Sequence, residues 1–321
     1  MGKFRRGYEN ISVELIDFVG NDLAKKAVKF GNLAEFYSGM TDEYSENNPI
    51  AIKMVDDIIQ GRTFPKYVFE GHNVTFQINN ISRINLAQLT REKGFFCSAS
   101  SGTRPLTQCF VTPLSIYNDK ELMKDLTDIE DRVERLYEKM ANKNISFLDS
   151  RYFGFHAQEI SLCYTTNAFN FMRSCNSRTE NNFADEINYT YRLMLYELKK
   201  AIKNTVTDKL SLKLWNWLLS FADKKGPYTR DNSYNNDFKR FKDPEGWTPK
   251  ETAHNDWRTS SWKLELEKMY YEKPELLFDG EKEMIENWLK LEKEGKELPS
   301  TYSEKTGLHD TIKSMYYYKG K

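Results

Sequence analysis

A long run near the middle of the chain has helical periodicity, and it sets the class of fold. From Asp119 to Asn142, apolar residues recur at steps of four and three, and mostly charged residues fill the positions between them. This spacing puts the apolar side chains on one face of an α-helix. That face is formed by Leu122, Leu126, Ile129, Val133, Leu136 and Met140. The pattern predicts a helix over 119–142 whose apolar face is buried in a core or against another helix.

Shorter elements are predicted on both sides of this run. Alternating apolar residues favour strands over 11–19, around 74–78 and over 159–166. Helical spacing and end signals favour helices over 22–34, 48–60, 81–91, 167–176 and 178–203, and near 258–272 and 281–294. In the helix over 178–203, Ser177 and Glu180 match a reciprocal cap. That cap would put Arg178 in a first turn, where a cation opposes the helix dipole.

The composition argues against several classes of protein. Lys+Arg and Asp+Glu both number 47 in 321 residues, so neither a nucleic acid nor a membrane surface is an expected partner. No apolar run is long enough to span a bilayer, and no secretory signal is recognisable, so a cytoplasmic location is expected. The four cysteines form no Cys-x-x-Cys pair, so reduced thiols and no metal site are predicted. They are Cys97, Cys109, Cys163 and Cys175.

The segment 91–104 has the composition of an anion-binding loop. It reads Arg91-Glu92-Lys93-Gly94-Phe95-Phe96-Cys97-Ser98-Ala99-Ser100-Ser101-Gly102-Thr103-Arg104. Small residues let the backbone approach a ligand closely, and flanking cations suit a phosphate. An ordinary polar loop can have the same composition, so this segment alone leaves both interpretations open.

A second segment contains three polar residues at a fixed spacing. Asn167 follows Arg151 by sixteen residues, and Arg178 follows Asn167 by eleven. Together the two segments resemble the signatures of the flavin-dependent thymidylate synthases, and the resemblance covers roughly residues 8–220. That family carries Arg-His-Arg, seven residues and Ser, where this chain has Arg91-Glu92-Lys93, seven residues and Ser101. The family's second signature spaces Arg, Asn and Arg as in this chain.

The resemblance implies an α/β (α+β) fold with a twisted, mostly antiparallel sheet and packed helices. It also implies a homotetramer with active sites between chains. The catalytic domain is expected over 1–222, and a linker with a mainly helical C-terminal extension over 223–321. The extension has no counterpart in the family core, and we expect it to pack against the catalytic domain or a neighbouring subunit.

The resemblance further implies two sites, one for a pyrimidine deoxynucleotide and one for FAD. The nucleotide-binding positions fall on Gln88, Ser101, Gly102, Arg104, Arg151 and Arg178. The catalytic positions fall on Ser101 and Arg178, with Glu92 as a candidate base. The cofactor-binding positions fall on Arg91, Glu92, Lys93, Ser98, Asn167 and Arg173.

The flavin half of the signature departs from the family pattern. Glu92 replaces its histidine, Lys93 its second arginine, and Ala99 an acidic residue. Phe169 stands in place of an arginine, and Arg173 in place of a neutral amide. The nucleotide half is therefore expected to be kept and the redox half to be altered.

The implied activity is one-carbon transfer from methylenetetrahydrofolate to C5 of dUMP or a close relative, with NADPH as reductant. Two alternatives remain, a dUMP or dCMP 5-hydroxymethylase and a non-catalytic nucleotide-binding homologue. Two side chains also have two interpretations each. His72 either lines the pocket or orders a turn, and Cys97 is either a nucleophile, if Lys93 lowers its pKa, or a small buried thiol.

Overall fold

The computed structural model describes residues 3–33, 44–61, 69, 71–91, 95–99, 109–179, 185–222 and 261–296. At its centre is a four-stranded sheet with strand order β2-β3-β6-β4, in which every neighbouring pair is antiparallel. The strands are β2 (Ser12–Phe18), β3 (Asn73–Ser82), β6 (Glu159–Asn167) and β4 (Phe95–Ala99). A separate parallel pair is formed by β1 (Phe4–Arg6) and β5 (Phe110–Thr112). The predicted antiparallel α/β fold is confirmed.

The two central strands carry the core on one face of the sheet. Val74, Phe76 and Ile78 alternate along β3 and are fully buried, as the sequence pattern predicts. The register pairs Phe76 with Tyr164 and Ile78 with Leu162, so β3 and β6 bury the same face. Burying one such side chain stabilises a fold by about 1.5–3 kcal/mol.

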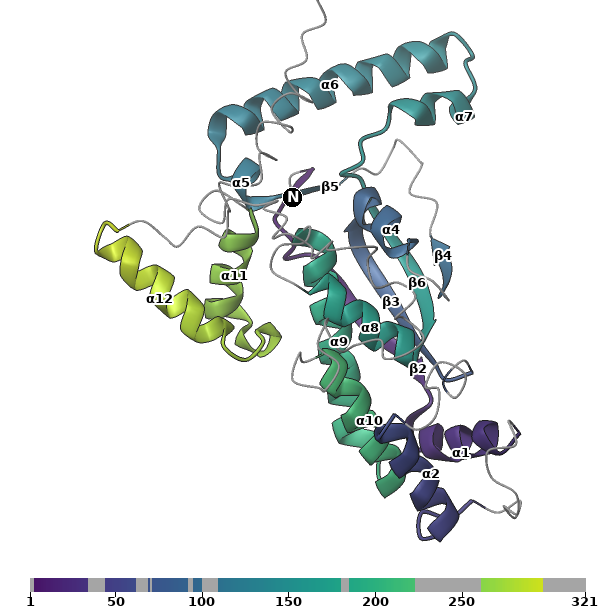
Figure 1. Cartoon of the computed structure of the whole chain (residues 1–321). Coiled ribbons are helices and arrows are strands. Elements are labelled where there is room, and N and C mark those ends of the chain that lie inside the picture. The colour runs from purple at the N-terminus through teal and green to yellow at the C-terminus, as the bar shows by residue number, and fades with distance from the viewer. Residues whose placement is uncertain are drawn as a thin grey trace, which may run out of the picture.

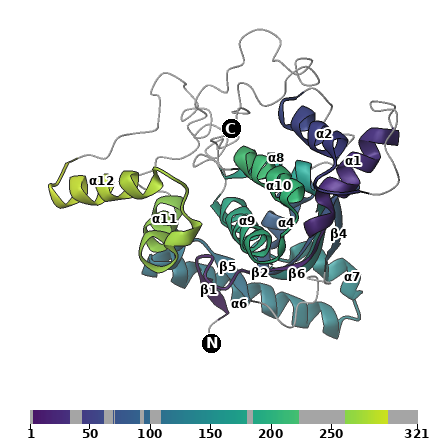
Figure 2. The same cartoon turned by 90° about the horizontal axis from the view of Figure 1, so that it is seen from below.

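Helices cover this face (Figures 1 and 2). They are α8 (Ala168–Arg178) and α9 (Asp185–Thr205), and α10 (Lys209–Ala222) packs against both of them. The ring of Phe171 on α8 lies 5.1 Å from Phe76 and 6.0 Å from Tyr191, measured between ring centroids. At one end α10 also contacts η1 (Gly20–Asp22), α1 (Leu23–Leu33) and α2 (Pro49–Ile59).

The predicted boundary at Arg178 is wrong. The residue does not begin a helix but lies in the last turn of α8, and α9 begins at Asp185. Asn167 caps α8, since its Oδ1 accepts a hydrogen bond from Asn170 N at 2.8 Å. From that cap, buried Phe171, Met172 and Cys175 continue the helix through the position where the sequence suggested a new cap. Arg178 therefore suits the helix dipole rather than opposing it.

Part of the predicted loop over 91–104 is a strand instead. Phe95–Ala99 forms β4, which pairs with β6 along its length. The predicted helix over 81–91 is shorter than expected, because Ile81 and Ser82 complete β3. It becomes α4 (Arg83–Leu89), with Ser82 Oγ accepting from Asn85 N at 3.1 Å as the cap.

The long central helix is confirmed, but the described residues bury only part of its apolar face. α6 (Lys120–Asn142) begins at the cap Asp119, whose carboxylate accepts from Glu121 N at 2.9 Å. Leu122 and Ile129 are each 48% exposed, and Leu136 is 37% exposed. Figure 1 shows α6 across one end of the molecule, between the short helices α5 (Leu114–Tyr117) and α7 (Phe147–Ser150).

Residues 261–296 share the core of the first 222 residues. They form α11 (Ser261–Glu272), the 3₁₀ turn η4 (Pro274–Leu276) and α12 (Glu281–Lys293), close to the two predicted helices. α11 contacts α5, and η4 contacts α9. Trp262 and Ile285 are fully buried and belong to the same hydrophobic cluster as Phe171. Residues 223–260, where the linker is predicted to begin, lie outside the described residues.

Two further predictions concern the cysteines and the membrane. All four cysteines are free thiols, as predicted. Within the described ranges, no helix combines the length and the apolar character that crossing a bilayer requires.

Candidate active site

The second motif lies on one continuous unit, β6 followed by α8. Asn167 ends β6 and caps α8, so its side-chain oxygen is already used in holding the helix start. Half-buried Arg178 lies in the last turn of the same helix. Arg151 begins the short 3₁₀ helix η2 (Arg151–Phe153), which precedes β6. The two arginines are therefore connected by a strand and a helix, both rigid elements.

The first motif reaches the same unit from the side of α4. Gln88 is half-buried near the end of α4, and Arg91 is exposed just beyond that end. The strand that follows, β4, begins with Phe95 paired to Thr166, next to Asn167. The structure thus brings the strand of the first motif beside the end of β6, where the second motif continues into α8.

Ser98 lies on the face of the sheet that is opposite to α8. It pairs with Cys163, which in turn pairs with Gln77, and paired residues in an antiparallel sheet share a face. Ser98 and Gln77 are exposed. On the same face, the hydroxyls of Thr75 and Thr165 are 3.0 Å apart. This face is consequently polar, whereas the opposite face is the apolar core.

Five of the predicted site residues lie outside the described residues. They are Glu92, Lys93, Ser101, Gly102 and Arg104. Their assignments remain predictions from the sequence. The backbone position of Arg151 is described, but its side chain is not.

Phe169, which stands in place of a family arginine, is part of the core packing. Its ring lies 6.4 Å from that of Phe69 in a stacked arrangement and 5.8 Å from that of Phe221, edge to face. Because Phe169 is uncharged and packed in this cluster, it cannot form an ion pair with a diphosphate as an arginine would. Arg173, one helical turn further along α8, is half-buried.

The structure favours the structural interpretation of both ambiguous side chains: His72 orders the chain, and Cys97 is a small thiol. His72 is fully buried, and burial lowers the pKa of its imidazole to about 4, with a smaller effect from Lys26. Its carbonyl accepts from Ala168 N at 2.7 Å, so it joins the start of β3 to the start of α8. Burial raises the pKa of the Cys97 thiol, and the neighbouring thiol of Cys163 adds to this. A raised pKa does not meet the condition for a nucleophile, so the structure favours the alternative of a small thiol at Cys97.

Sequence reasoning assigned no role to Glu186, in the first turn of α9. Its carboxylate accepts from Ser82 N at 2.6 Å and from Ser82 Oγ at 2.5 Å. Asn85 Nδ2 lies 3.4 Å from the same carboxylate. The residue as a whole is partly exposed, but its carboxylate is enclosed by these groups. Burial therefore raises the pKa of Glu186 to about 7, although the hydrogen bonds from Ser82 act in the opposite direction.

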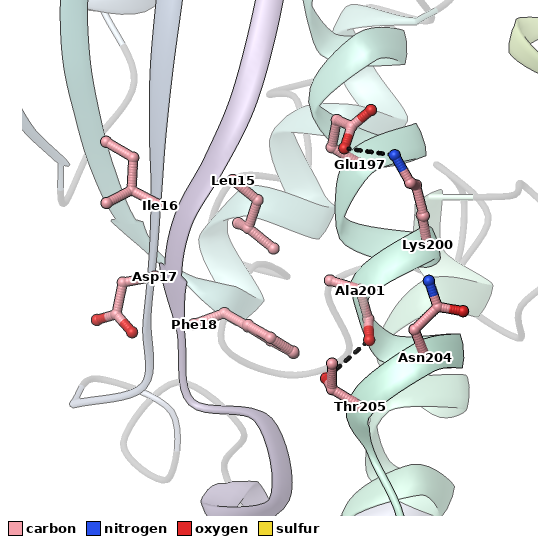
Figure 3. A pocket seen from close by; sticks show the side chains of 9 residues that line it. All are labelled: Leu15, Ile16, Asp17, Phe18, Glu197, Lys200, Ala201, Asn204 and Thr205. Atoms are coloured by element: carbon pink, nitrogen blue, oxygen red, sulfur yellow. Dashed lines mark hydrogen bonds and ion pairs between the residues drawn. The ribbon is translucent and has the colours of Figure 1, made fainter.

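A groove between β2 and α9 does not coincide with the predicted site (Figure 3). Its lining is Leu15, Ile16, Asp17, Phe18, Glu197, Lys200, Ala201, Asn204 and Thr205. The polar contacts drawn there are internal to α9, such as the Lys200–Glu197 ion pair at 3.6 Å. None of the residues predicted to bind a nucleotide or cofactor lines this groove.

Comparison with known proteins identifies the family. The family described as thymidylate synthase complementing protein matches residues 23–202, which is more than half of the chain. No curated protein matches significantly. Two crystal structures of the UMP/dUMP methylase PolB from Streptomyces cacaoi are similar to this chain. The complex with 5-Br dUMP has 17% identity and a TM-score of 0.48, over 61% of this chain and 92% of that one. The complex with 5-Br UMP has 15% identity and a TM-score of 0.49, over 68% and 96%. By its family match, this chain belongs to the thymidylate synthase complementing proteins, the flavin-dependent thymidylate synthase family.

Proposed function

We propose that this chain transfers a one-carbon unit from methylenetetrahydrofolate to C5 of a pyrimidine deoxynucleotide, dUMP or a close relative. The observation that supports this most is the unbroken spacing of Arg151, Asn167 and Arg178 within the matched family region. In the structure these residues belong to η2, β6 and α8, which follow one another along the chain.

The proposed nucleotide site depends on arginine. A guanidinium is planar and always charged, and it can donate two parallel hydrogen bonds to a phosphate or a ring carbonyl. We assign Arg151 to the nucleotide, and Arg178 to the pyrimidine ring. There Arg178 would stabilise the enolate-like charge that develops when C5 attacks the one-carbon donor. Gln88, Ser101, Gly102 and Arg104 complete the proposed site.

The described residues fit FAD in part. Arg91 at the end of α4 and Arg173 on α8 are cations that could hold its diphosphate, and Ser98 lies on the polar face of the sheet. Phe169, in contrast, is committed to packing against Phe69 and Phe221. Bound FAD, reduced by NADPH, would supply the hydride equivalent that a methyl product requires.

The altered flavin half favours a second candidate product, a 5-hydroxymethyl nucleotide. After transfer, tetrahydrofolate leaves and an exocyclic methylene remains on C5. Addition of water to this methylene gives a hydroxymethyl group without any change in oxidation level, because the methylene already has the oxidation level of formaldehyde. The water oxygen forms a bond to the methylene carbon, and the electron pair of the exocyclic double bond returns to the ring. One proton of the water passes to Glu92, the candidate base, and the other remains on the new hydroxyl. Neither a hydride nor NADPH is then consumed.

One incubation separates these possibilities. The protein is mixed with methylenetetrahydrofolate and dUMP or dCMP, with and without NADPH, and the products are identified by mass. A strictly NADPH-dependent methyl product identifies a thymidylate synthase, and an NADPH-independent hydroxymethyl product identifies a hydroxymethylase. If neither forms, and the purified protein shows no flavin absorbance, the non-catalytic nucleotide-binding homologue is the remaining candidate. Arg178→Ala serves as the control, because its loss should abolish either product.

A further inference from the structure

Helix α6 carries an apolar row that the rest of the described chain leaves uncovered. Leu122, Ile129 and Leu136 form this outer row and are 48%, 48% and 37% exposed. The helix contacts its own subunit through another side, where buried Glu130 accepts from Lys3 Nζ at 3.0 Å. Figure 1 shows α6 extended across the end of the molecule rather than inside a bundle.

A second apolar row runs beside the first at the same repeat. Leu126, Val133 and Met140 form this inner row, and all three are half-buried. The steps between the two rows alternate between four and three residues, so each row repeats every seven residues. A strict repeat of seven is the pattern of a helix that packs lengthwise along another helix, with a slight supercoil. The pattern thus indicates a helical partner rather than a small ligand.

We propose that α6 pairs, in the antiparallel direction, with α6 of a second copy of this chain. In an antiparallel pair, the residues of one apolar row meet those of the other row on the facing helix. Leu122 then meets Met140 of the second copy, and Leu126 meets Leu136. Ile129 meets Val133 of the second copy next to the two-fold axis. All six apolar residues on each helix obtain an apolar neighbour, and the symmetry closes the pair.

The charges that flank the outer row select this direction. Asp125, Arg132 and Lys139 repeat every seven residues at the edge of the seam, and all three are exposed. In the antiparallel pair Asp125 faces Lys139 of the second copy, and the two-fold axis repeats this contact. In a parallel pair Asp125 would instead face Glu130 of the second copy, a contact between like charges.

One contact in the antiparallel pair is unfavourable, since the two Arg132 side chains approach each other near the axis. Asp128 lies one turn before Arg132 on the same helix and is exposed, so each guanidinium has a carboxylate within reach. The attractive contacts between Asp125 and Lys139 remain on both sides of the axis. The pairing follows from exposure and charge alone, and it does not depend on the proposed reaction.

Sedimentation velocity of the full chain tests the seam. We expect the wild-type protein to be a dimer or a larger assembly, and Ile129→Glu to yield a smaller assembly with an unchanged circular dichroism spectrum. Ile16→Glu on β2 is the matched control, because Ile16 is similarly exposed at 51% but lies outside the seam. A monomeric wild-type protein, or an assembly unaffected by Ile129→Glu, would overturn the proposal.

Charge reversal tests the specific contact. Asp125→Lys and Lys139→Asp should each weaken the association by about tenfold, since each replaces two attractive contacts with two repulsive ones. Combining both substitutions should restore it, because the pair is then reversed on both sides of the axis. Failure of the double variant to associate better than the single variants would contradict the proposed contact.

Cysteine cross-linking tests the direction. In the antiparallel pair the two copies of residue 122 are about 27 Å apart, because 18 residues separate it from its neighbour at 140. Leu122→Cys alone should therefore form no disulfide at this position, whereas Leu122→Cys combined with Met140→Cys should form one between the two copies. Peptide mass mapping distinguishes this bond from any formed by the native cysteines. A disulfide between two copies of Cys introduced at 122 alone would show a parallel pair and overturn the direction.

Discussion

The charge on Arg192 is buried inside the protein, and its partner lies on the C-terminal extension. The Arg192 side chain is 0% exposed, and its guanidinium donates to both oxygens of Glu281, at 2.6 and 2.7 Å. It also donates to Leu276 O at 3.0 Å and to Asn188 Oδ1 at 2.8 Å. The ring of Phe278 lies 4.4 Å from its Cζ. We predict that Glu281→Gln destabilises the protein strongly, although the side chain hardly changes in volume.

The magnitude follows from the cost of an uncompensated buried charge. Removing one partner of a buried ion pair typically costs about 3–5 kcal/mol, because the remaining ion keeps its desolvation penalty and loses its counter-charge. The whole stability of a domain is about 5–15 kcal/mol. Glu281→Gln should therefore remove a large share of it. Replacing both residues, as in Arg192→Met with Glu281→Leu, should cost less than Glu281→Gln alone, because no charge is then left buried.

Urea unfolding followed by tryptophan fluorescence measures this loss, and hydrogen exchange locates it. If residues 261–296 detach before the rest unfolds, the faster exchange will appear in α11 and α12 first. Glu283→Gln is the matched control, since Glu283 is also acidic and in the first turn of α12 but is exposed. We expect less than about 0.5 kcal/mol for this control. Equal losses for Glu281→Gln and Glu283→Gln would refute the argument from the buried charge.

Two further predictions concern the proposed site, and a third concerns the enclosed carboxylate of Glu186. Arg178→Ala should leave the fold intact and abolish measurable turnover, because the activation barrier rises by about 2–4 kcal/mol; near-normal turnover in a folded variant would remove the assignment. Ser101→Ala should weaken nucleotide binding more than Ser98→Ala, and titration with nucleotide decides between them; equal small effects would show that the loop is misaligned. Burial raises the pKa of Glu186 from 4.5 to about 7, so its protonated form favours the fold. That stabilisation is complete below about pH 4.5 and is lost as the pH rises through about 7. Glu186→Gln mimics the protonated carboxyl and also removes a charge near Glu159. This substitution should flatten the pH dependence of the unfolding free energy between about pH 4.5 and 7. An unchanged profile would mean that another group titrates.

Elements with a strong internal period were predictable from the sequence, because their signal is local. The strand through Val74, Phe76 and Ile78 and the helix α6 are such cases. Periodicity shows which residues share a face, but it does not show what covers that face. This is why the exposure of Leu122 and Ile129 had to come from the structure.

Features that depend on distant partners were not predictable. Phe95–Ala99 becomes a strand because β6 offers it a pairing edge, and β6 lies more than 60 residues later in the chain. Glu186 is 104 residues from Ser82, so no local pattern marks its carboxylate as enclosed. The boundary at Arg178 failed for another reason, because two local signals competed. A cap pattern begins at Ser177, but the helix started by Asn167 continues through it.

Two polar contacts at opposite ends of β3 add to the caps at Asn167 and Ser82 in holding the starts of the helices that carry the proposed nucleotide residues. At one end, the carbonyl of His72 accepts from Ala168 N at 2.7 Å, at the start of α8. At the other end, Glu186 accepts from Ser82 N at 2.6 Å, at the start of α4. An α-helix holds a fixed rise and rotation per residue, so a fixed first turn also fixes the positions that follow. The positions of Arg178 on α8 and Gln88 on α4 therefore depend in part on contacts that neither family signature contains.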